Sequence, residues 1–124
     1  MQEEKEMNVY LAGPMRGIPE FNFPAFHEAA RKLRADHHVV FSPAEKDAEI
    51  YGDDVSSPTG NEHTMARKLG ITTMELRREV FLIDCEWICK HADAIALLPG
   101  WESSKGATAE RALGIALGLR IIEL

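Results

Sequence analysis

The sequence predicts a single α/β domain built on one doubly wound, Rossmann-like or flavodoxin-like parallel sheet of four to five strands, with helices on both faces. Short apolar runs alternate along the chain with longer segments of helical periodicity. Gly-Pro, Ser-Pro and Pro-Gly pairs close three of the apolar runs, as turns do after strands. A length of 124 residues suits one hydrophobic core, so we expect one domain over residues 1–124.

The first part of the chain predicts a strand, a helix and a second strand. We expect a frayed tail over residues 1–7 and a buried strand over Asn8–Ala12. Phe23–Arg34 is predicted to be helical, because its apolar residues recur at 3.6-residue spacing. His38–Phe41 is the second predicted strand, and strand–helix–strand is the unit that builds parallel sheets.

The rest of the chain predicts an irregular segment and then two helix–strand pairs. Residues 44–70 are polar and lack periodicity, so we expect a mobile flap over a site there. Ile71–His91 predicts a helix with Thr72 or Thr73 as its N-cap. The remaining predicted elements are a strand at Asp93–Leu98, a helix at Ala107–Leu117 and a strand at Leu119–Leu124.

Composition disfavours several classes of protein. The formal net charge of −6 gives no general attraction to a nucleic-acid polymer. The charged N-terminus is no secretion signal and no apolar run approaches a membrane span, so we expect a cytoplasmic protein without a membrane partner. Cys85 and Cys89 lack the partners of a metal site and are interpreted as structural thiols.

Two carboxylates fall on or beside the buried stripes of predicted helices. Glu110 shares a stripe with Leu113 and Leu117, and Asp84 borders the stripe of the preceding helix. A buried carboxylate is costly unless it is used or paired, and two inward carboxylates are the usual equipment for cleaving a glycosidic bond. The structural alternative is an ion pair, of Glu110 with Arg111 or Arg16 and of Asp84 with Lys90 or Arg77.

Two glycine-containing turns are predicted at the sheet edge where ligands of such folds bind. Gly13–Gly17 follows a strand and brings backbone N–H groups and Arg16, and Ser103–Gly106 precedes the last helix. Both can hold an anion, although most glycine turns are only turns. Neither is a G-x-G-x-x-G motif or a P-loop, so nucleotide binding by those routes is disfavoured.

Two aromatic residues are predicted near the same edge. Tyr10 lies in the first strand, where core packing with a satisfied hydroxyl is the structural alternative to a role in the site. Trp101 follows Gly100 in a loop, where its ring either stacks on a base or anchors the loop.

Five segments taken together carry a resemblance to a known family: Tyr10–Gly17, Phe21–Phe26, Ser42–Glu45, Asp93–Glu102 and Ser104–Glu110. As a set they resemble a family of small, largely phage and bacterial proteins of unassigned function in the nucleoside 2-deoxyribosyltransferase-like superfamily. The resemblance covers residues 8–124.

The resemblance implies roles for three residues. In the better-studied relatives, which are deoxyribosyltransferases and 2′-deoxynucleoside 5′-monophosphate N-hydrolases, a glutamate on the last helix attacks C1′ of the sugar, and Glu110 takes that position. In the hydrolases an Asp-x-x-Trp aspartate serves the sugar and proton transfer, and Asp84 with Trp87 matches this pattern. Tyr10 matches the tyrosine that touches the catalytic glutamate.

The resemblance also implies a substrate site and an oligomer. A serine six residues before the glutamate holds the 5′-phosphate in the relatives, and Ser104 stands at that distance. The residues expected to bind substrate are Gly13, Met15, Arg16, Gly17, Ser104, Gly106 and Trp101. We expect no metal or other cofactor, and a homodimer or higher homo-oligomer because relatives form them.

The sequence departs from the relatives in ways that bear on the reaction. Ile83 stands where relatives often have arginine, and residues 44–79 do not align with them. The transferases often complete each site with a neighbour's C-terminal residues, and little tail follows the last predicted strand here. We therefore expect hydrolysis of a (deoxy)nucleoside 5′-monophosphate. The alternatives are base exchange between deoxynucleosides, non-catalytic nucleotide binding and, more weakly, cleavage of NAD-like dinucleotides.

Overall fold

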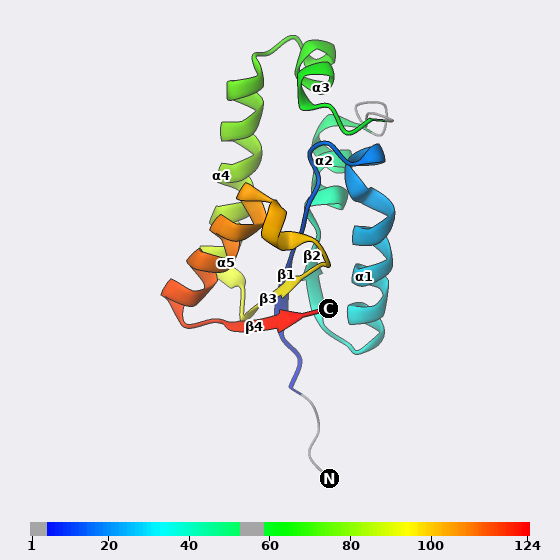
Figure 1. Ribbon diagram of the computed structural model, residues 1–124. Coiled ribbons are helices and arrows are strands. Elements are labelled where there is room, and N and C mark those ends of the chain that lie inside the picture. The colour runs from blue at the N-terminus through cyan, green and yellow to red at the C-terminus, as the bar shows by residue number, and fades with distance from the viewer. Residues whose placement is uncertain (1–4, 53–58) are drawn as a thin grey trace.

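Four parallel strands form the sheet of the computed structural model, which describes residues 5–52 and 59–124 (Figure 1). They are β1 (Asn8–Ala12), β2 (Val39–Phe41), β3 (Ala94–Leu97) and β4 (Arg120–Glu123). Their order across the sheet is β2-β1-β3-β4, and every neighbouring pair runs parallel. The predicted α/β class is confirmed. Residues 1–4 of the predicted tail and 53–58 of the predicted flap lie outside the described residues.

Alternating side chains along β1 show why helices cover both faces of the sheet. Val9 and Leu11 pack into the core shared with α1 (Phe23–Ala35), whereas Tyr10 and Ala12 pack towards α4 (Thr73–His91) and α5 (Lys105–Leu117). Successive side chains of a strand point to opposite faces, and all four of these are fully buried. Figure 1 accordingly shows α1 on one side of the sheet and α4 and α5 on the other.

Side-chain caps fix the N-termini of the two helices on the second face. The Thr72 hydroxyl accepts from the backbone N–H of Glu75 at 3.1 Å, and the Glu75 carboxylate accepts from that of Thr72 at 3.2 Å, which makes Thr72 the cap. The Ser104 hydroxyl accepts from the backbone N–H of Ala107 at 3.1 Å. Helix α5 therefore begins at Lys105, two residues before the predicted start.

The prediction of an irregular flap over residues 44–70 is wrong for the described part of that segment. Two helices lie there, α2 (Pro43–Tyr51) and α3 (Glu62–Leu69). The Asn61 side chain caps α3 by accepting from two backbone N–H groups, and Gly70 ends the helix with a φ of 71°. Each helix buries only two or three residues, so neither shows a long apolar stripe.

Two smaller predictions also fail. Leu117 is 47% exposed, and the buried residues of α5 are Ala107, Glu110 and Gly114. A Cβ at Gly114 would lie 2.6 Å from Cγ1 of Ile95, so this glycine allows α5 to approach β3 closely. The predicted tail is tied down at its end, because the backbone N–H of Met7 donates to Nδ1 of His38 at 3.1 Å.

No helix within the described ranges is long and apolar enough to cross a bilayer.

Candidate active site

A cavity of about 890 Å³ opens at the carboxyl ends of β1 and β3. Strand β1 lies between β2 and β3 in the sheet, so the connections that leave it and enter β3 pass over opposite faces. Ligands of open α/β sheets bind at such a switch point. The loop after β1, helices α2, α3 and α4, and the N-terminus of α5 all contribute to the cavity wall. The volume is within the range of small-molecule sites.

The three residues predicted to be catalytic meet at this cavity. The Tyr10 hydroxyl donates to Oε2 of Glu110 at 2.6 Å, and Asp84 lines the same space from α4. Glu110 is 6% exposed and Asp84 is 5% exposed. The Tyr10 ring is stacked on Phe41, with ring centroids 5.5 Å apart, so the hydroxyl that contacts Glu110 is held by a packed ring.

Burial raises the pKa values of Tyr10, Asp84 and Glu110. Desolvation raises the pKa of Glu110 to about 8, although the hydrogen bond from Tyr10 opposes the shift. Desolvation, followed by the charges of Glu110 and Asp47, raises the pKa of Asp84 to about 9. Burial and the two carboxylates also raise the pKa of Tyr10 well above its ordinary value. Both carboxyl groups therefore hold their protons well above the ordinary carboxyl range, and as a coupled pair they lose them in two steps.

The ion pairs considered as structural alternatives for the two acids do not form. Arg16 and Arg77 pair with Glu62, and Lys90 pairs with Glu86. The Arg111 guanidinium lies over the ring of Trp101, 5.0 Å from its centroid. Within residues 5–52 and 59–124, neither Asp84 nor Glu110 has a cationic partner within ion-pair distance.

Both predicted anion-binding turns line the cavity. Gly13, Met15, Arg16 and Gly17 line it from the loop after β1, and Ser104 and Gly106 line it from the start of α5. A Cβ at Gly13 would lie 2.8 Å from Cβ of Leu98, so this turn needs glycine for close packing. A Cβ at Gly106 would meet only the Ser104 hydroxyl, at 3.9 Å. The first backbone N–H groups of α5 therefore lie beside the open space of the cavity.

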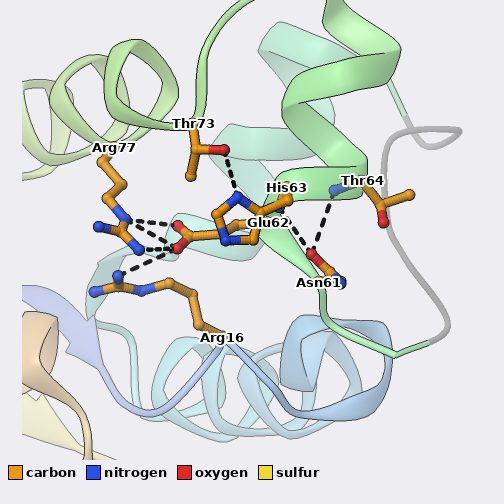
Figure 2. Close-up of polar contacts among 7 residues, drawn as sticks. All are labelled: Arg16, Asn61, Glu62, His63, Thr64, Thr73 and Arg77. Atoms are coloured by element: carbon orange, nitrogen blue, oxygen red, sulfur yellow. Dashed lines mark hydrogen bonds and ion pairs between the residues drawn. The ribbon is translucent and has the colours of Figure 1, made fainter.

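A second set of charges lines the cavity from α3 and α4, and the sequence did not reveal it. Figure 2 shows the guanidinium groups of Arg16 and Arg77 converging on one carboxylate, that of Glu62. Nε of Arg77 donates to both Glu62 oxygens, at 2.9 and 3.0 Å, and Nη1 of Arg16 lies 3.6 Å from Oε1. Partial burial alone would raise the pKa of Glu62, but the two arginines outweigh it and lower the pKa.

One predicted site residue lies elsewhere. Trp101 is not among the described residues that line the cavity. Its indole N–H donates to the Glu123 carboxylate at 3.3 Å, and its ring packs in the core beneath α5. This position matches the alternative considered for Trp101, an aromatic that anchors its own loop.

Asp47 is another cavity residue that the sequence reasoning missed. It lies on α2 and is 9% exposed, and among residues 5–52 and 59–124 no cation forms an ion pair with it. A signal was present in the sequence. Pro43 opens a helix immediately after β2, and Asp47 lies four residues later on the same helical face. In the part of the chain that the structure describes, no three His, Cys, Asp or Glu side chains gather as metal ligands would.

Comparison with known proteins gives one match. Residues 7–123 match the family described as a domain of unknown function, DUF4406. No curated protein and no solved structure matches the chain.

Proposed function

The chain belongs to the DUF4406 family, and we propose that it is an N-glycosidase that hydrolyses the base–sugar bond of a (deoxy)nucleoside 5′-monophosphate. The observation that carries the proposal is the pair of unneutralised acids, Glu110 and Asp84, on the wall of a cavity that also presents guanidinium groups and a helix N-terminus. The resemblance to nucleoside 2-deoxyribosyltransferase-like proteins supports the same reaction.

The two acids divide the chemistry as the resemblance implies. Once the pair has lost one proton, the Glu110 carboxylate, which accepts the Tyr10 hydrogen bond, attacks C1′ of the sugar. Asp84 keeps the other proton and delivers it to the departing base as the C1′–N bond breaks. Water then attacks C1′ and displaces Glu110. Asp84, now a carboxylate, takes the proton of that water and returns to its starting state.

Tyr10 positions and tunes Glu110. Its hydroxyl donates to the carboxylate at 2.6 Å, which favours the ionised form that attacks the sugar. The stacked Phe41 ring keeps the hydroxyl in place.

The 5′-phosphate is held where positive charge and N–H groups meet. Arg16 lines the cavity from the loop after β1, and the N-terminus of α5 supplies backbone N–H groups. The Ser104 oxygen accepts from Ala107, which leaves its own proton free to donate to a phosphate oxygen.

The reaction needs no metal or redox cofactor, because two carboxyl groups supply its acid, base and nucleophile. The net charge of −6 favours a small-molecule nucleotide over a nucleic-acid polymer as substrate, and the resemblance favours a homodimer or higher homo-oligomer.

The protein is incubated with a panel of ribo- and deoxyribonucleoside 5′-monophosphates and the matching nucleosides, and the free base that is released is measured by chromatography. We expect release from monophosphates by the wild type and none by Glu110→Gln. Glu86→Gln is the matched control, because Glu86 is an exposed residue of α4 that pairs with Lys90. Release that occurs only with an added acceptor base would establish base exchange instead. No release under either condition would refute the glycosidase and favour a nucleotide-binding protein.

A further inference from the structure

The cavity is lined by three buried acids, and the proposed reaction uses only two of them. Asp47 is the third, and it reaches the cavity from α2, on the side of the sheet that carries α1 (Figure 1). Asp84 and Glu110 reach it from α4 and α5, respectively. Asp47 therefore lines the cavity from a different element than the reacting carboxylates.

Part of the cavity lining suits a flat aromatic ring. Its apolar part is made of residues from the loop after β1 and from α1, α2, α3 and α4: Phe21, Phe26, Pro43, Met65, Val80 and Phe81. The phosphate-binding groups proposed above lie at the loop after β1 and at the start of α5. With the phosphate there and C1′ at Glu110, the base occupies the apolar part of the cavity.

Asp47 is buried and lies one helical turn after Pro43, which belongs to this apolar part of the lining. A buried polar group without a partner costs free energy unless a ligand satisfies it. Desolvation raises the pKa of Asp47 to about 7, so much of the population carries a proton at neutral pH. In that form the carboxyl group has one donor and one acceptor side by side.

We propose that Asp47 is a specificity-determining residue that hydrogen-bonds the edge of the substrate base, donating from one oxygen and accepting with the other. The inference rests on the proposed function, since it assigns a base to this part of the cavity. Each nucleobase presents an adjacent donor and acceptor on its pairing edge, but purines hold that edge farther from C1′ than pyrimidines do. A carboxyl group at a fixed place in the cavity therefore pairs with some bases and is left unpaired by others, and a site with an unpaired polar group rejects that base. Asp47 thus supplies base discrimination, whereas the phosphate contacts are the same for every nucleotide.

The test measures nucleotide affinity in a background that cannot turn over. Calorimetric titration of Glu110→Gln with the four common deoxynucleoside 5′-monophosphates gives the spread of affinities among bases. The same titrations are made with Glu110→Gln combined with Asp47→Ala, with Asp47→Asn, or with Glu49→Gln as a matched control on the exposed face of α2. Inorganic phosphate is titrated into every variant, and circular dichroism with thermal denaturation reports that each is folded.

We expect Asp47→Ala to weaken binding of the preferred monophosphate by tenfold to hundredfold and to level the affinities among bases, with phosphate affinity unchanged. Asparagine also presents an adjacent donor and acceptor, so Asp47→Asn retains affinity within about threefold. An unchanged spread in Asp47→Ala, or an equal loss in both variants, would overturn the inference while base release by the wild type still upholds the glycosidase. Failure of every monophosphate to bind any folded variant would overturn both.

Discussion

Glu62 and Glu110 line the same cavity and lie in opposite electrostatic environments. Glu62 receives two guanidinium groups, and its pKa falls below the ordinary value (Figure 2). Glu110 receives one neutral hydroxyl and is almost completely buried, and its pKa rises to about 8. Glu62 is therefore ionised throughout the neutral pH range, whereas Glu110 gains and loses its proton close to that range.

The difference separates structural from chemical use of a carboxylate. The Glu62 charge is matched by cations, so it orders two arginines and has little reason to react. The Glu110 charge is unmatched, so its ionised form is high in energy and gains most from a positive centre in the cavity. A sugar carbon that develops positive charge as the base departs is such a centre. The variants below test this difference, and they are ordered from the largest expected effect to the smallest.

The largest effect is expected from Glu110→Gln. Replacing the nucleophilic carboxylate with an amide of the same shape should lower kcat by about a thousandfold or more, because an amide neither attacks C1′ nor balances its charge. Single-turnover base release is the measurement. A loss of less than about tenfold, with Glu86→Gln at wild-type activity, would remove Glu110 from the mechanism.

The next effect concerns the proton of Asp84. The rate should rise with pH as the coupled pair of Glu110 and Asp84 loses its first proton and fall as it loses the second, which gives an optimum of kcat/KM well above the ordinary carboxyl range. Asp84→Asn should lower kcat by about a hundredfold and abolish the alkaline fall, since asparagine has no acidic proton to lose. A pH profile that keeps both limbs in Asp84→Asn would assign the alkaline limb to another group.

Substitution of Glu110 and of Glu62 should change the free energy of unfolding in opposite directions at neutral pH. Folded Glu110 keeps a proton that the unfolded chain releases above about pH 4.5, so its contribution to the free energy of unfolding falls as pH rises towards about 8. Glu110→Gln should therefore stabilise the protein at neutral pH by about 2 to 3 kcal/mol, with the gain fading near pH 4. Glu62 has a lowered pKa, so its contribution is present at neutral pH and is lost as pH falls.

Glu62→Gln should accordingly destabilise the protein at neutral pH by about 1 kcal/mol, with a difference that fades in acid. Urea denaturation of both variants at several pH values makes the comparison. Equal effects of the same sign would mean that the two environments do not differ as described.

Sequence reasoning succeeded where a residue type stands at a conspicuous place in a periodic element. Tyr10, Asp84 and Glu110 were found because a buried strand and two helices predict which way a side chain points. The sheet followed from three apolar runs and from the last short run of the chain.

The missed parts depend on contacts that periodicity does not report. Helices α2 and α3 have few apolar residues. The remaining signals were Pro43 in the first turn of α2 and the caps of α3, Asn61 and Gly70. Asp47 and Glu62 reach the cavity only because these helices fold over it. Glu20, Phe21 and Asn22 adopt positive φ angles without a glycine among them, which local sequence preference does not predict.

The smallest predicted effect separates the two glycines of the phosphate site. Gly106→Ala should leave stability unchanged or slightly higher, because its Cβ meets only the Ser104 hydroxyl at 3.9 Å and alanine favours the helix. The added methyl group should still raise KM for monophosphates by about fivefold, because it stands between the phosphate and the N-terminus of α5. Gly13→Ala is the contrasting control. Its Cβ would lie 2.8 Å from Cβ of Leu98, so this substitution should lower thermal stability. If Gly106→Ala raises KM equally for nucleosides without phosphate, the N-terminus of α5 does not hold that group.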